Sequence, residues 1–366
     1  MDNRFYTIKG IATEFPPDNQ FYIEMMDQKM HTYYYEGDSK LSEIDCILAE
    51  LYDLMMMYMF ADADKYYEII GSLPLADQIA GYDSDCQMDV EQFETLLKRI
   101  QGKTIIERDV MLVDTQFLIG SIQNLLQAMH FDFINYFISL SEVDARQTKD
   151  GDYCCAGYVC SQPFSFLTSY ITRAYSVMDI LTKLAFEFDN DFGAYTGITK
   201  LRSRNKLFGH RKYLSIYGQA GTVFENSNNN CIGTIESLRN ELVHNGSWEL
   251  TQKIFIRIKN GEVLDRYICW PQSQEGHLTT IVNRKRFFSE ERTANEILVQ
   301  IHSEYLERLF NTVSLMKTEY TKRLPKRTFE TLLGISYEDA LLQVASYYSA
   351  IKEQARGHEE DDNSME

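Results

Sequence analysis

Four polar side chains on one predicted helix are the residues of this sequence best suited to chemistry. Glu236, Asn240 and His244 are spaced four residues apart, so a helix places them on one face. Arg239 precedes Asn240, and its long side chain can reach that face. Gly246 follows the predicted helix end, where glycine is the usual stop signal. The spacing therefore predicts a cation, an amide and an imidazole together at an exposed helix end.

These side-chain types suit cleavage of a phosphodiester without a metal. The dipole at a helix C-terminus favours the protonated imidazole, and Glu236 or Glu241 nearby acts in the same direction. A histidine that titrates near neutral pH suits general acid–base catalysis. A guanidinium stays charged and donates paired hydrogen bonds to a phosphate. The alternative is structural, because histidine often caps a helix end and chance often supplies this spacing of arginine and histidine.

A basic run elsewhere in the sequence favours an RNA target. Residues 200–212 contain six cations and no acid, although the whole chain carries a net charge of −18. The six are Lys200, Arg202, Arg204, Lys206, Arg211 and Lys212. Phe208 lies among them and offers a surface on which a base can stack. Such a run can follow an RNA backbone. The alternative is a solvated loop that pairs with the protein's own carboxylates.

The motif of Arg239, Asn240 and His244 resembles the signature of the HEPN superfamily. In that signature an arginine, commonly followed by a polar residue, is separated from a histidine by four to six residues. Four residues separate Arg239 from His244 here, and Asn245-Gly246 follow. Family members are helical bundles that carry the motif late in the domain, at the end of a helix. The resemblance covers residues 150–325, approximately.

The resemblance implies a metal-independent endoribonuclease that leaves a 2′,3′-cyclic phosphate and a 5′-hydroxyl. His244 would transfer the proton or stabilise the attacked phosphate, and Arg239 would hold the phosphate and its developing charge. Asn240 would orient the phosphate or the motif of a partner. Two facing copies of the motif usually build such a site, so RNA as substrate and a homodimer with a composite active site are implied.

The family resemblance also suggests a biological setting, and it leaves two other functions open. Such domains commonly act as toxins or in antiviral defence, with an antitoxin or a defence-system protein as a further partner. Some members are not enzymes. One alternative is therefore a non-catalytic protein-interaction module, in which Arg239 and His244 pack or cap. The other is a nucleotide-binding module that serves another enzyme.

The composition limits the class of protein. The strongly negative net charge argues against coating nucleic acid or docking on an anionic membrane, and no span is apolar enough to cross a bilayer. Seven cysteines show no secretory disulfide pattern, so reduced thiols in a cytoplasm are expected. Cys154, Cys155 and Cys160 cluster without a CxxC pair or a nearby histidine, which favours ordinary thiols over a metal site. We expect no metal and no cofactor.

Apolar periodicity predicts a mainly α fold: a HEPN-like helical bundle with a small β-hairpin insertion and an additional N-terminal helical region. Residues 1–36 read as irregular or weakly extended. Helices are expected from Ser39 onward and over 90–100, 108–140, 163–188, 231–244, 289–324 and 337–356.

The β-rich part of the sequence and the domain limits follow from turn and breaker signals. Asn260-Gly261 predicts a hairpin within 253–270, and 279–288 offers a third strand. The expected division is an N-terminal helical region over 1–145, a HEPN-like domain over 150–325, and a C-terminal helix with an acidic tail over 326–366.

Overall fold

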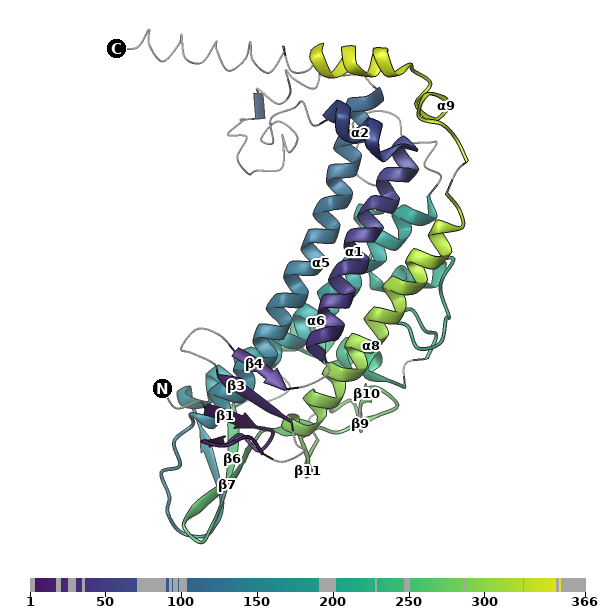
Figure 1. Cartoon of the computed structure of the whole chain (residues 1–366). Coiled ribbons are helices and arrows are strands. Elements are labelled where there is room, and N and C mark those ends of the chain that lie inside the picture. Colours follow the sequence, from purple (N-terminus) through teal and green to yellow (C-terminus); the bar gives the residue numbers. More distant parts are fainter. Residues whose placement is uncertain are drawn as a thin grey trace, which may run out of the picture. The chain divides into compact units, whose positions relative to one another are not determined.

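The chain is mainly helical, which confirms the predicted fold class (Figure 1). The computed structural model describes residues 4–17, 21–25, 31–34, 37–70, 90–91, 94, 98, 104–190, 202–227, 229–246, 251–285, 287–324, 326–346 and 349. Its α-helices are α1 (Gly37–Phe60), α2 (Ala63–Ile70), α5 (Thr104–Ser141), α6 (Ser161–Asp189), α7 (Cys231–His244), α8 (Ala294–Thr321) and α9 (Phe329–Leu333). Residues 337–346 are also helical. Short 3-10 turns are η1 (Tyr158–Cys160), η3 (Arg202–Asn205) and η4 (Phe208–Tyr213). In these residues no helix is long and apolar enough to span a membrane.

Two compact units make up the chain, and each is assembled from three segments. Unit 1 contains Met1–Cys46, Ser121–Ile180 and Arg211–Ser314, and unit 2 contains Ile47–Gly120, Leu181–His210 and Leu315–Glu366. Both units therefore draw on segments from each side of residue 150. The sequence predicted three consecutive domains, whereas these units are built from interleaved segments. The boundaries of the three expected domains stay a prediction.

The first strands of unit 1 form a sheet that the sequence did not reveal. Strands β1 (Arg4–Thr7), β2 (Ala12–Thr13), β3 (Tyr22–Met25) and β4 (His31–Tyr34) pair antiparallel in the order β2-β1-β3-β4. Phe5, Tyr6 and Ile23 are buried. The sequence predicted irregular or weakly extended structure here, and the described residues are extended. Their pairing into a sheet was not predicted, because strands of four residues or fewer are too short to show a clear alternation.

The predicted hairpin forms, with a different third strand. Strands β6 (Lys253–Lys259) and β7 (Glu262–Tyr267) pair antiparallel, and Asn260 and Gly261 both adopt positive φ, of 56° and 79°. Those angles are what a two-residue hairpin turn needs. The third strand is β5 (Gly151–Ala156), which pairs with β6.

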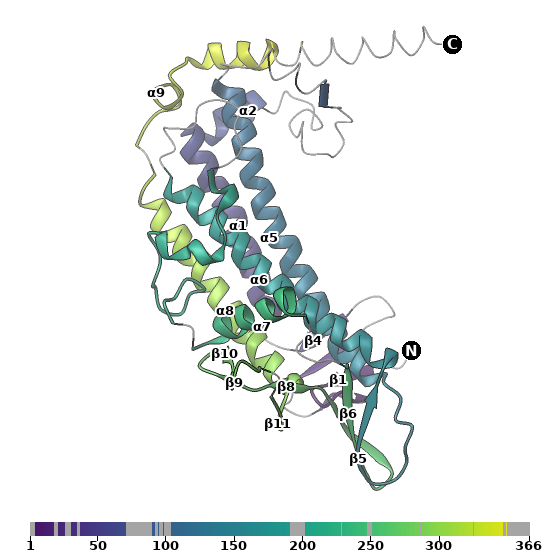
Figure 2. The ribbon, with the colours of Figure 1, turned by 180° about the vertical axis from the view of Figure 1, so that it is seen from behind.

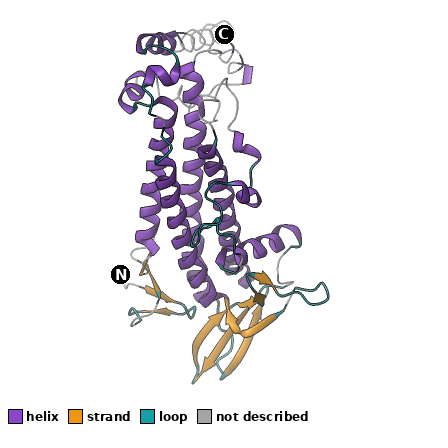
Figure 3. Cartoon of the chain, turned by 90° about the vertical axis from the view of Figure 1, so that its right-hand side faces the viewer, coloured by secondary structure: helices purple, strands orange, loops and turns teal. Residues whose placement is uncertain are grey.

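Residues 279–293 differ from the expectation. Ile281 and Arg284 form only an isolated bridge, so the expected strand over 279–288 is wrong. Strand β11 (Phe288–Thr293) pairs with β8 (Cys269–Pro271), and β9 (Ser273–Gln274) pairs with β10 (His277–Leu278). The helix expected from 289 therefore begins later, with α8. Figure 3 shows the strands of unit 1 near one end of its helices.

A buried amide and a glycine turn tie the sheets of unit 1 to its helices. Asn295, at the start of α8, donates from Nδ2 to the carbonyls of Ile8 (2.7 Å) and Arg266 (2.9 Å). Its Oδ1 accepts from the Tyr136 hydroxyl on α5, at 2.7 Å. Gly10 has a φ of +61°, and a Cβ there would lie 2.7 Å from the Arg266 carbonyl oxygen. This turn therefore requires glycine.

The core of unit 1 includes a neutral histidine. His302 of α8 is fully buried and stacks on Phe133 at 4.0 Å between ring centroids. The Tyr170 hydroxyl lies 3.1 Å from its Nδ1. Burial lowers the pKa of His302 well below its usual range and lowers that of His130 to about 4.

Unit 2 has its own buried polar network. The Arg108 guanidinium donates to the carbonyls of Met59 and Leu332, and the Tyr66 hydroxyl donates to Asp109 at 2.8 Å. Burial raises the pKa of Asp109 to about 7, against the opposing effect of that hydrogen bond. These bonds fix the helix ends of unit 2 to one another.

Replacing Gly10 with alanine is expected to destabilise the protein by more than about 1 kcal/mol, because a positive φ and a backbone clash both oppose a Cβ. Gly218→Ala is the matched control, since its φ is +82° and nothing lies within 4 Å of the added carbon. Chemical denaturation measures both. Equal losses in the two variants would show that the close approach to Arg266 carries no cost.

Acid is expected to destabilise the fold through His302. Below about pH 6.5 the unfolded histidine binds a proton that the folded one does not, so the free energy of unfolding falls as the pH drops below about 6.5. His302→Asn keeps an acceptor for the Tyr170 hydroxyl and does not titrate there. Denaturation at stepped pH should give a shallower decline for this variant than for the parent protein. Parallel curves would contradict the assignment, because the buried carboxyls are common to both proteins.

Candidate active site

Helix α7, which carries the predicted motif, has the limits that the sequence predicted. The Asn230 side chain accepts hydrogen bonds from the backbone amides of Ile232 (3.0 Å) and Gly233 (3.3 Å), which caps the first turn. At the other end the Asn245 amide donates to the Glu241 carbonyl at 2.9 Å. Gly246 adopts a φ of +86° and ends the helix. His244 therefore lies in the last helical turn.

Apolar and polar contacts hold α7 in unit 1. Ile235 and Leu238 are fully buried, and the Ser237 hydroxyl accepts from the Leu278 amide at 3.1 Å. Figure 2 shows α7 beside α6 and α8. This packing fixes which side of α7 meets the protein and which side meets solvent.

Arg239 lies over an aromatic ring of α6 and reaches Asn240. Its guanidinium carbon is 4.5 Å from the centroid of the Tyr175 ring. Its Nη1 donates to Asn240 Oδ1 at 3.1 Å. Stacking holds the plane of a guanidinium and leaves its edge donors for other partners. The expectation that this side chain can reach the Asn240 face therefore agrees with the geometry.

The two remaining motif residues face solvent. Asn240 and His244 are exposed, and Arg239 is half-buried. Within the described part of the chain, no hydrogen bond or ion pair engages the His244 imidazole, and none joins it to Arg239. Glu236 differs, because its carboxylate lies 3.6 Å from Arg211 Nη2. On this face of α7, Glu236 is therefore paired with Arg211, whereas the His244 imidazole at the C-terminal end has no partner among the described residues.

Tyr175 is a neutral platform for Arg239. Burial raises the pKa of its hydroxyl to about 12, and the charges of Asp179 and Glu236 add to the rise, whereas Arg239 and Arg211 oppose it. The phenol therefore stays protonated at neutral pH. A neutral ring keeps the face that attracts the guanidinium.

Glu241, the acid within the motif, is a structural residue. Its side chain is buried and accepts from Asn245 Nδ2 at 2.9 Å and from Lys285 Nζ at 3.3 Å. These bonds join the end of α7 to the segment that precedes β11. The carboxylate thereby holds Asn245, the residue after His244.

The predicted basic run is divided between the units. Lys206, in unit 2, lies with its Nζ 5.0 Å from the Phe186 ring centroid. Arg211 and Lys212 belong to unit 1, and Lys212 is exposed above Tyr213. Lys200 and the side chains of Arg202 and Arg204 lie outside the described residues. Only Arg211 is shown to contact the motif helix, so RNA binding by the whole run stays a prediction.

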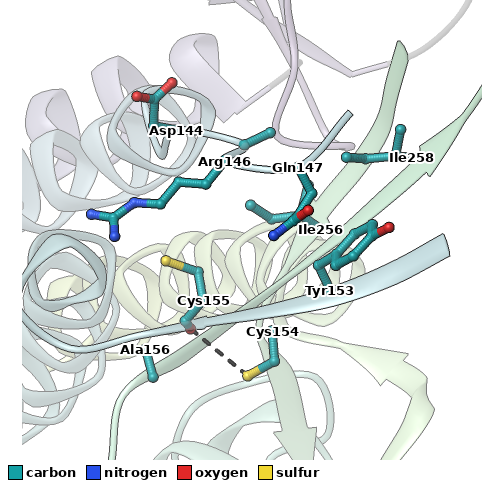
Figure 4. A pocket seen from close by; sticks show the side chains of 10 residues that line it. Asp144, Arg146, Gln147, Tyr153, Cys154, Cys155, Ala156, Ile256 and Ile258 are labelled. Atoms are coloured by element: carbon teal, nitrogen blue, oxygen red, sulfur yellow. Dashed lines mark hydrogen bonds between the residues drawn. The ribbon is translucent and has the colours of Figure 1, made fainter. Parts of the chain in front are cut away.

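A separate cavity of about 310 Å³ lies against β5 and β6. Figure 4 shows the Cys155 thiol and the Gln147 amide on one side of β5 together with Arg146, and Cys154 on the other side. Cys160, whose thiol donates to the Cys155 carbonyl at 3.3 Å, is buried, which raises the pKa of that thiol to about 12. The cavity contains no motif residue, and among the described residues no three potential metal ligands cluster.

Comparisons with known proteins add no family. No protein-family model, curated protein or solved structure matches this chain. The HEPN resemblance therefore depends on the motif and its geometry alone, and it stays a prediction.

Sequence reasoning missed the partners that place the motif. Tyr175 lies in the predicted 163–188 helix, and nothing in the sequence shows that this helix meets α7. The run Arg284-Lys285-Arg286 was also overlooked, although three successive cations are a visible signal. Its first two residues lie beside the end of α7.

Arg239→Ala is expected to lower the free energy of unfolding by less than about 1 kcal/mol, since a half-exposed cation–π contact contributes little. Arg308→Ala is the contrasting variant. Arg308 is largely buried and pairs with Glu225 (2.5 Å) and Glu304 (2.8 Å), so its loss should cost about 3 kcal/mol or more. Urea denaturation compares them. A loss at Arg239 as large as that at Arg308 would make Arg239 a structural residue.

Proposed function

We propose that this protein is a metal-independent endoribonuclease of the HEPN type, with Arg239, Asn240 and His244 as its active-site residues. One observation carries the proposal. Arg239 is oriented by Tyr175 and by Asn240 at 3.1 Å, on the same helix as an exposed imidazole. A fixed cation and an accessible proton-transfer group are the parts that such a reaction needs.

The chemistry requires these side chains, the RNA and water. The 2′-hydroxyl attacks the adjacent phosphorus and loses its proton, and the bond from phosphorus to the 5′-oxygen breaks as that oxygen gains a proton. His244 transfers one of these protons and water exchanges the other, and Arg239 neutralises the charge that develops on the phosphoryl oxygens. Arg239 and His244 are five helical positions apart, which is about 7.5 Å along the axis. An arginine side chain can span much of that distance, and the phosphodiester itself occupies the rest.

A second copy of the chain completes the proposed site. Arg239, Asn240 and His244 belong to an exposed or half-exposed face, so a second motif can approach them without breaking a buried contact. In such an arrangement Asn240 orients the phosphate or the partner's motif. The proposed setting is a toxin or an antiviral-defence system of the cytoplasm, by analogy with the family alone.

A non-catalytic interaction module is the second candidate. The contact of Arg239 with Tyr175 and the pairing of Arg211 with Glu236 are what a purely structural role for this face requires. The two candidates differ over His244, whose imidazole has no structural partner in the described chain.

The purified protein is expected to cleave a labelled single-stranded RNA in the presence of EDTA. His244→Ala should lower the rate by about a hundredfold or more, since a general acid or base contributes at least that factor. Denaturing gel electrophoresis of timed samples measures the rates. His277→Ala is the matched control, because that histidine is exposed on β10 outside the motif.

Absence of cleavage by the parent protein, or equal rates for the parent and His244→Ala, would reject the proposed mechanism. Loss of activity in His277→Ala as well would show that the effect is not specific to the motif.

A further inference from the structure

A cavity of about 470 Å³ lies at the C-terminal end of α7. Glu241 and Asn245 line it from α7, and Asn283, Arg284, Lys285 and Phe287 line it from the segment before β11. Asn245 directly follows His244 in the chain, so the cavity lies next to the last turn of α7, which carries the exposed imidazole. No motif residue other than the structural Glu241 contributes to it.

The lining of this cavity favours an anion. It contains two cations and one carboxylate, and that carboxylate is already engaged by Lys285 and Asn245. Arg284 has an exposed side chain, and the contact recorded for its guanidinium is with a neutral acceptor, the Val282 carbonyl, at 3.2 Å. Among the described residues no carboxylate forms an ion pair with the Arg284 guanidinium, and a guanidinium without such a partner is available to a phosphate.

A tight turn presents Arg284 at the cavity. Ile281 and Arg284 exchange backbone hydrogen bonds of 3.0 Å in both directions. Val282 and Asn283 between them adopt φ values of +49° and +61°. A β-branched residue such as valine rarely adopts that conformation. The turn is therefore held by its two hydrogen bonds, and it sets the position at which the guanidinium leaves the backbone.

An aromatic ring completes the lining. Phe287 is half-buried, and its carbonyl accepts from the Gln272 amide at 2.8 Å, which fixes the backbone at this point. Nucleobases stack on such rings in proteins that bind single-stranded nucleic acids. A phosphate contact and a stacking surface thus lie in one cavity, beside a proton-transfer group.

We propose that this cavity binds one nucleotide of a single-stranded RNA, next to the bond that is cleaved. Arg284 contacts the phosphate of this nucleotide, and Phe287 stacks on its base. The Glu241–Lys285 ion pair holds the segment that carries Arg284 and Phe287 against the end of α7. The inference rests on the proposed ribonuclease function, and it adds a residue-level substrate site to it. An acidic peptide is the competing ligand for a cationic cavity.

Binding of a fluorescein-labelled single-stranded RNA to the full-length His244→Ala protein in EDTA tests this site by fluorescence anisotropy. Adding Arg284→Ala should weaken binding about tenfold and reduce the salt dependence of Kd by about one phosphate contact. Phe287→Ala should weaken binding about tenfold through lost stacking, and Phe287→Tyr should restore it. Lys259→Ala removes an exposed cation of β6 and should change Kd less than about twofold.

Affinities for Arg284→Ala and Phe287→Ala that match Lys259→Ala would overturn the cavity assignment. If the parent still cleaves RNA in that case, the proposed function survives without the cavity. RNA binding that depends on Arg284 and Phe287, in a parent that does not cleave RNA, supports the cavity and rejects the ribonuclease. Saturable binding of an acidic peptide without RNA binding rejects both. Unchanged denaturation midpoints exclude misfolding as the cause of a weakened Kd.

Discussion

The side chain of Asn295 joins four elements of unit 1 through three hydrogen bonds. It donates to the turn after β1 and to β7, and it accepts from a tyrosine of α5, while its own backbone begins α8. A buried amide left without these partners would cost about 1–3 kcal/mol per unsatisfied group. Loss of any one of the three bonds therefore leaves a buried polar group unsatisfied and destabilises the junction. The relative placement of the first sheet, the hairpin and two long helices within unit 1 follows from that constraint.

The position of α7, the helix that carries the motif, depends on the same framework indirectly. Leu278, which bonds to Ser237 of α7, lies in β10, and the strands around it lead into β11 and α8. On α7 itself, Glu236 and Glu241 are engaged in ion pairs, whereas Asn240 and His244 project into solvent. Pairing the acids leaves the cationic and proton-transfer groups as the free chemistry of this helix end.

Local signals in the sequence predicted much of the secondary structure. The C-terminal limit of α7 followed from Asn245 and Gly246, because the end of a helix is decided within a few residues of the chain. The Asn260-Gly261 turn was equally local. The first sheet was missed because its strands are short, and β11 was taken as a helix start because Ser289-Glu290-Glu291 resembles a first helical turn.

The sequence predicted which residues form the candidate site, but it did not predict which residues surround them. Spacing alone indicated that Asn240 and His244 share a face. The stacking of Arg239 on Tyr175 and the cavity that Arg284 lines with Asn245 join residues 64 and 39 positions apart in the sequence. Such contacts depend on how helices pack, which no local pattern specifies. The interleaving of the two units was hidden for the same reason.

In the proposed reaction the 2′-hydroxyl of the RNA is the nucleophile. His244 transfers either the proton of that hydroxyl or the proton of the leaving 5′-oxygen. The most direct measurement compares an RNA that is cleaved at one position with the same RNA carrying a single 2′-deoxynucleotide there. The account predicts that the unmodified strand yields a 2′,3′-cyclic phosphate and that the substituted position is not cut. Cleavage at the 2′-deoxy position would contradict it.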